Sequence, residues 1–152
     1  ALEAVKTLLY FKTPDSISYI KHYMLSKDTL LREQTVRLAG VYRVKEAVPY
    51  MIELLEKKDL FGAESFNKVS VVKALGDIGE PSALKILYKI CDSNSLLYKS
   101  ELEKLKIEIF KNLQNYPFQD VKPLLELGLK SKIKDIQLIS EKLQKSIGEK
   151  HE

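Results

Sequence analysis

The sequence contains one cysteine, two histidines and no tryptophan among its 152 residues. A single cysteine excludes an intramolecular disulfide framework and a cysteine-based metal cluster. Cys91 aligns with apolar residues of the repeats described below, so we expect a buried and unreactive thiol. His151 lies in the polar C-terminus, and His22 is the other imidazole. We therefore expect no catalytic Ser/His/Asp or Cys/His arrangement, no metal site and no cofactor.

Long apolar runs and Gly/Ser or Pro-rich tracts are also lacking. No stretch of about 18 apolar residues could span a membrane, and no composition marks a linker. With 45% hydrophobic and 30% charged residues, the composition is that of a folded chain, and its length predicts a single domain over 1–152. The sequence begins without Met inside a predicted helix, so we expect a piece of a longer protein. The compartment stays open, with the cytoplasm favoured.

Charge of one sign is not concentrated anywhere in the chain. The net charge of +4 and the pI of about 9.0 arise from 25 basic and 21 acidic residues that are interspersed throughout. Nucleic-acid-binding proteins usually gather basic residues into one stripe, so nucleic acid is an unlikely partner. The short basic segment 130–134 is interpreted as a solvated loop, with a phosphate or partner contact as the alternative.

The sequence does contain an internal repeat. Residues 16–28 align without a gap with 47–59, and Ala47 aligns with Ala83 in the next copy. These two alignments bring Pro14 onto Pro81, although neither was built on the prolines. A weaker fourth copy includes the segment that starts at Asp120. The repeats predict helical hairpins over 1–28, 30–59, 64–93 and 100–131, followed by a terminal helix over 133–148.

The clearest copy runs from Val69 to Asp92. Its first helix places Val69, Val72, Leu75 and Gly76 on one face, and its second helix places Leu84, Leu87, Tyr88 and Cys91 on one face. Gly76 and Gly79 interrupt the pattern of the first helix, so residues 76–79 are interpreted as the inter-helix turn, with glycine allowing the positive φ that closes a helix. Pro81 starts the next helix. We expect that Gly76 stands where the two helices of the hairpin approach. Tyr10, Tyr42 and Tyr88 fall near apolar stripes and are expected to pack.

The phrases VRLAGVYRVKEAVPYMIELLEK and VKALGDIGEPSALKILYKI resemble the HEAT and HEAT-like (armadillo-type) helical repeats. The resemblance covers nearly the whole chain. It implies an all-α fold, a right-handed α-α superhelix of about four helical hairpins plus the C-terminal helix. It also implies that the second helices line a concave wall, which in this family binds other molecules.

The implied function is that of a protein-binding scaffold and not of an enzyme. Its partner would be a peptide or a helix of another protein. The alternatives are a nucleic-acid-binding HEAT-like domain and a regulatory subunit or accessory domain of an enzyme. Outward positions of the second helices form one row of His22, Glu53, Lys89 and Glu126 and a neighbouring row of Ser18, Pro49, Lys85 and Lys122. The predicted partner-binding residues are Tyr19, His22, Tyr50, Glu53, Lys85, Lys89, Lys122 and Glu126. Tyr19 and Tyr50 could instead bridge neighbouring repeats.

Overall fold

The computed structural model describes residues 2–11, 13–57 and 68–148, and within these ranges every regular element is a helix. The prediction of an all-α chain is confirmed for this part of the sequence. The predicted boundary between the second and third units, at 59–64, lies outside the described residues. In chain order the elements are α1 (Leu2–Phe11), α2 (Pro14–Met24), α3 (Thr29–Val41), η1 (Lys45–Ala47), α4 (Val48–Glu56), α5 (Lys68–Ile78), η2 (Pro81–Ala83), α6 (Leu84–Asp92), α7 (Lys99–Lys111), α8 (Phe118–Leu129) and α9 (Lys134–Gly148).

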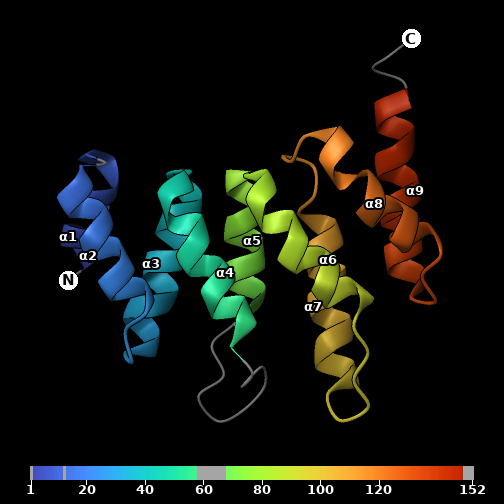
Figure 1. The fold of residues 1–152 in the computed structure, drawn as a ribbon, viewed down its shortest axis with the longest axis horizontal. Helices are drawn as coiled ribbons and strands as arrows, with labels where there is room; N and C mark the ends of the chain where they lie inside the picture. Colours follow the sequence, from blue (N-terminus) through green and yellow to red (C-terminus); the bar gives the residue numbers. More distant parts are fainter. Residues whose placement is uncertain (1, 12, 58–67, 149–152) are drawn as a thin grey trace.

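The helices are arranged as a row of hairpins in two layers (Figure 1). The first helix of each hairpin packs against the next first helix, in the order α1, α3, α5, α7 and then α9. The second helices follow one another in the same way, from α2 through α4 and α6 to α8. The two ends of the chain lie at opposite ends of this row (Figure 1). Each hairpin therefore buries its apolar faces against its neighbours along the chain.

Proline and short polar side chains set where the helices begin. Thr13 caps α2, where its hydroxyl accepts a hydrogen bond from the Ser16 amide at 3.2 Å, and Pro14 follows as the first helical residue. Asp28 caps α3 by accepting from the Leu31 amide at 3.0 Å. Pro81 opens the short 3-10 helix η2, which runs directly into α6. Pro14 and Pro81 thus mark the same point in two hairpins, as predicted.

Glycines take two different roles in the third hairpin. Gly79 has a φ of 69° and its amide donates to the Leu75 carbonyl at 2.9 Å, so it ends the helix as predicted. The predicted turn over 76–79 begins too early, because α5 continues through Gly76 to Ile78. Gly76 lies inside α5 and faces the next hairpin, so its predicted place between the two helices of its own hairpin is wrong. A Cβ atom there would stand 2.5 Å from the Asn112 Cβ and 2.7 Å from the Asn112 carbonyl oxygen. Gly40 on α3 likewise faces Ala74 of the next first helix, whose Cα would lie 2.8 Å from an added Cβ.

One continuous hydrophobic core runs through the hairpins, from Val5 on α1 to Ile136 on α9. On α5 the core differs from the sequence-based prediction. Val69 is exposed, and Lys68 is buried with only 5% of its surface accessible. Val69 lies beyond Gly76 at the edge of the apolar arc, whereas Lys68 falls within that arc next to Leu75 and Val72.

At three hairpin junctions, a cation from the following first helix donates a hydrogen bond at the C-terminal end of the preceding second helix. The Lys68 Nζ donates to the Leu55 and Lys57 carbonyls, both at 2.9 Å, at the C-terminal end of α4. Arg32 of α3 donates from Nη1 to the Ser26 carbonyl just after α2, at 3.0 Å, and Lys106 of α7 donates to the Ser93 carbonyl just after α6. The last carbonyls of a helix lack intrahelical partners and carry partial negative charge, so a cation is stabilising there. These three side chains tie neighbouring hairpins together.

We predict that Gly76→Ala destabilises the protein although alanine is the better helix former. The added methyl group meets both the side chain and the backbone of Asn112, and the strain of overpacking, about 1–3 kcal/mol, exceeds the propensity gain of about 1 kcal/mol. Chemical denaturation measures the free energy of unfolding. Lys73→Ala, at an exposed position of the same helix, is the control and should change it by about 0.5 kcal/mol at most. A Gly76→Ala protein as stable as the parent would contradict the close approach.

A second prediction concerns the buried lysine. Lys68→Met keeps the length of the side chain but leaves two carbonyls at the end of α4 without their donor, so unfolding free energy should fall by about 1.5–3 kcal/mol. Lys106→Met makes the same chemical change where the hydrogen bond is exposed to water, and should cost less than about 1 kcal/mol. Equal losses in the two variants, measured by denaturation, would show that burial of the Lys68 cap does not matter.

Candidate binding surface

The eight residues predicted to bind a partner all lie on the second helices, which follow one another in one layer. They are Tyr19 and His22 on α2, Tyr50 and Glu53 on α4, Lys85 and Lys89 on α6, and Lys122 and Glu126 on α8. Tyr50 is half-buried, and the other seven are exposed. We call this set of side chains the second-helix surface.

Matched repeat positions on the second-helix surface share the same exposure. The row of His22, Glu53, Lys89 and Glu126 is exposed at every position, and so is the row of Ser18, Pro49, Lys85 and Lys122. In the part of the chain that the structure describes, no hydrogen bond or ion pair joins any two of the eight predicted residues. Charges of both signs alternate along the surface, and the two lysines of α6 make its middle the more basic part.

Tyr50 connects two neighbouring second helices. The Lys21 Nζ of α2 lies 5.5 Å from the centre of the Tyr50 ring on α4. A cation over an aromatic face contributes about 0.5–1 kcal/mol at an accessible site. Tyr50 therefore bridges neighbouring repeats, which the sequence offered as the alternative to partner binding for this residue. Tyr19, one unit earlier, is more than half exposed.

Three other tyrosines differ in how they pack. Tyr42 is half-buried against the core, as predicted. Tyr10 is 73% exposed and Tyr88 is also exposed, so the prediction that they pack is wrong. On α6 the buried arc runs from Leu84 through Leu87 to Ile90 and Ile86, and this leaves Tyr88 just outside it. Tyr10 lies in the last turn of α1, in the first hairpin of the row.

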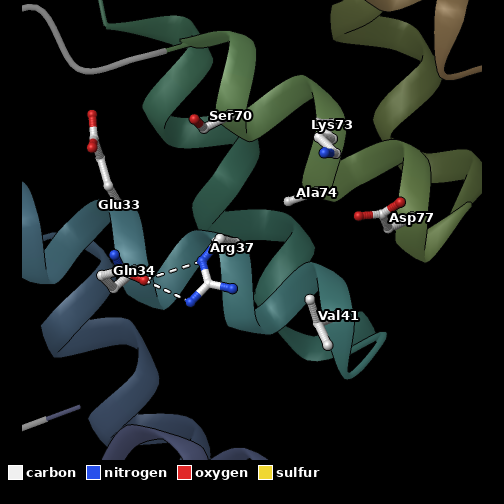
Figure 2. A pocket seen from close by; sticks show the side chains of 8 residues that line it. All are labelled: Glu33, Gln34, Arg37, Val41, Ser70, Lys73, Ala74 and Asp77. Carbon is white, nitrogen blue, oxygen red and sulfur yellow. Dashed lines mark hydrogen bonds between the residues drawn. The ribbon is translucent and has the colours of Figure 1, made fainter.

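A groove of about 390 Å³ lies on the first-helix layer, between α3 and α5 (Figure 2). Its apolar part consists of the exposed Val41 and of Ala74. Its polar lining consists of Glu33, Gln34 and Arg37 from α3 and of Ser70, Lys73 and Asp77 from α5. The guanidinium of Arg37 donates from Nε and Nη2 to the Gln34 Oε1, at 3.1 and 2.8 Å, as the dashed lines in Figure 2 show.

Sequence reasoning did not find this groove, because two helices from different hairpins form it. Its central contact is the Gly40–Ala74 approach, where small residues bring the helices together. A signal was nevertheless present, since Gly40 and Ala74 both belong to the repeated phrase that carries the family resemblance. The groove holds two carboxylates and two cations, so it has no strong net charge to attract an ion.

His22 and Cys91 lie in different surroundings. His22 is exposed and meets Tyr23 edge-on, with ring centres 5.7 Å apart. Cys91 is buried, as predicted, and burial raises its thiol pKa from 9.0 to about 12, although the nearby Lys106 cation partly offsets this rise. Among the described residues no group of three or more His, Cys, Asp or Glu side chains is placed to hold a metal ion. His151 lies outside the described residues.

Comparison with protein-family models and with curated proteins found no match for this chain. Over the described ranges, none of the helices combines the length and the apolar composition needed to cross a bilayer. The placement of the predicted residues on one layer of the fold is therefore the basis for assigning a function.

We predict that Cys91 reacts far more slowly with an aromatic disulfide reagent in the folded than in the unfolded protein at pH 8. The thiolate is the attacking species, and a pKa of about 12 in place of 9.0 lowers its population roughly a thousandfold. The absorbance of the released thiolate measures the rate, with the protein in denaturant as the reference. The folded rate should rise as the pH approaches 12. Equal rates in the two states at pH 8 would show that the thiol is accessible and ionised.

Proposed function

We propose that this chain is a HEAT-like repeat domain, wound as a right-handed superhelix, that acts as a non-enzymatic scaffold for a protein partner. Three observations support the proposal: the sequence phrases that resemble this family, the two-layer row of hairpins, and the succession of first helices packed on first helices. Domains of this architecture bind partners over a surface built from several repeats.

One observation carries the proposal more than any other. Four consecutive second helices present matched, exposed positions side by side, and nothing within the described chain covers them. Neighbouring packed helices stand about 8–10 Å apart, so four of them form a strip roughly 30–40 Å long. A strip of that length accommodates an extended peptide or a helix of another protein.

The chemistry of the strip favours a partner with charges of both signs. Glu53 and Glu126 stand in the same row as Lys89, and Lys85 and Lys122 stand in the neighbouring row. Such a surface repels a uniform polyanion at some positions and attracts it at others, whereas a protein segment can place a complementary charge at each. The second candidate is a nucleic-acid-binding domain, which the pI of about 9.0 favours.

Photo-crosslinking in the native cells distinguishes these candidates and locates the surface. A photoreactive amino acid replaces Lys89 on the second-helix surface in one variant, and Lys73 on the first-helix layer in the matched variant. We predict protein adducts from position 89 and few from position 73, because only the first lies on the proposed surface. Gel mobility before and after nuclease treatment, followed by mass spectrometry, identifies the adducts.

Two outcomes of the crosslinking would contradict the proposal. Adducts that form only from position 73 would assign binding to the first-helix groove. Adducts from position 89 that nuclease removes would show that the second-helix surface binds nucleic acid. A further variant that also carries Lys85→Glu, with an unchanged unfolding transition, should lose the protein adducts of position 89 if complementary charge holds the partner.

A further inference from the structure

A cleft of about 580 Å³ lies away from both surfaces described so far, between the loop after α6, the body of α7 and the loop after α8. An adjoining cavity of about 130 Å³ extends it inward, and the two share Lys106, Ser131 and Ile133. In Figure 1 the two loops are the yellow segment between α6 and α7 and the orange segment between α8 and α9. We call this combined space the α7 cleft.

Positive charge dominates the rim of the α7 cleft. Lys99, Lys106 and Lys132 line its outer part and Lys130 lines its inner part, against a single carboxylate from Glu103. The carboxylate of Glu103 stands 4.0 Å from the Lys99 ammonium, so one lysine is neutralised. No ion pair with another described residue engages Lys106, Lys130 or Lys132. The basic segment 130–134, interpreted from sequence as a solvated loop, is thus joined by two lysines of α7.

Apolar side chains are also exposed to water at the α7 cleft: Leu96 lines it, and Leu97 and Tyr98 follow Leu96 in the sequence. Leu96 is 99% exposed and Leu97 is 86% exposed, and Tyr98 beside them is also exposed. Three consecutive exposed apolar residues are unusual on a folded domain unless they bind something. Further in, the lining is apolar as well, with Leu102 and Ile133 in the outer part and Phe110 and Ile136 in the inner part.

Hydrogen bonds hold both loops in place. The Ser93 hydroxyl donates to the Ile90 carbonyl at 2.7 Å, and the Tyr98 amide donates to the Ser95 hydroxyl at 3.3 Å. In the loop after α8, the Ile133 amide donates to the Ser131 hydroxyl at 3.1 Å. Lys106 connects the first loop to α7 through its bond to the Ser93 carbonyl. The leucines and lysines are therefore presented together by a defined backbone.

We propose that the α7 cleft binds an acidic peptide segment of another protein that carries leucine-sized side chains between its carboxylates. Charge complementarity selects the acidic residues, since three lysines of the rim have no carboxylate partner within the described chain. The exposed Leu96 and the apolar lining select the leucines, because burying them removes apolar surface from water. This site is separate from the second-helix surface. The cleft is proposed to bind a negatively charged segment, whereas the second-helix surface is proposed to bind a segment that carries charges of both signs.

The test uses fluorescence anisotropy with a labelled synthetic peptide of Asp and Glu residues around two leucines. We expect binding at low ionic strength that weakens toward physiological salt, because the Debye length shortens from about 30 Å at 0.01 M to about 8 Å. Lys130→Glu/Lys132→Glu and Leu96→Ser should each weaken binding about tenfold or more. Leu96, Lys130 and Lys132 are all exposed, so the unfolding transition should not change.

The matched control for charge is Lys27→Glu/Lys142→Glu, two exposed positions outside the cleft with the same change in net charge. It should weaken binding clearly less than Lys130→Glu/Lys132→Glu does, because the exchanged charges lie farther from the peptide. An equal loss in this control would overturn the proposal, since binding would then follow net charge alone. So would equal affinity for a peptide with serines in place of the leucines, tighter binding of labelled single-stranded DNA than of the peptide, or no binding at low salt.

Discussion

The close approach of successive first helices is the contact on which the remaining arrangement depends. At Gly40 and Gly76 the helix surfaces meet the next hairpin with no room for a side chain. A hydrogen bond from the Asn115 Nδ2 to the Gly76 carbonyl, at 3.0 Å, spans the same junction. Since interiors pack at crystal-like density, such a junction has one well-defined geometry. The positions of the second helices, and so the rows of exposed side chains on them, follow from it.

A second constraint acts at the other end of the hairpins, where each second helix stops. Its terminal carbonyls would be costly to bury without partners. Lys68 supplies a partner for such a carbonyl in α4, and Arg32 and Lys106 donate to the carbonyls of Ser26 and Ser93, which lie just after α2 and α6. The alignment that places Ala47 on Ala83 also places Arg32 on Lys68. The two cations therefore occupy the same position in successive hairpins. Lys68 stands in the first turn of α5, where a cation is ordinarily unfavourable. Its stabilising contact is instead with the carbonyls at the end of α4.

Much of the fold was predictable from the sequence because helical periodicity and helix-start signals are local. The matched prolines placed two helix starts, Gly79 marked a helix end, and aligned positions gave the burial of Cys91 and the exposure of the His22 row. The repeat alignment also placed the candidate binding residues on one layer. Whether they bind a partner remains a prediction, because exposure is necessary for binding and does not establish it.

The features that could not be predicted involve two hairpins at once. Periodicity placed Val69 in the core and gave no reason to bury Lys68, because the carbonyls that receive its ammonium belong to the preceding helix. For the same reason, Gly76 was predicted to contact the second helix of its own hairpin, whereas it contacts Asn112 of the next hairpin. The first-helix groove and the α7 cleft are formed by side chains that lie far apart in the sequence, so local patterns such as Gly40 with Ala74, or the basic segment 130–134, indicate only a part of each.

Lys106 shows how one residue can serve both the fold and a binding site. Its ammonium carries three donors, and the bond to the Ser93 carbonyl uses one of them. The same side chain lines the α7 cleft, which leaves two donors for the proposed acidic ligand while the Ser93 carbonyl keeps its bond. The same ammonium stands close enough to Cys91 to favour the thiolate, yet burial outweighs it and the thiol stays protonated. At Cys91, the loss of solvation on burial therefore has a larger effect on the thiol pKa than the positive charge of Lys106. On the solvent side, the same charge is what the proposed acidic ligand would contact.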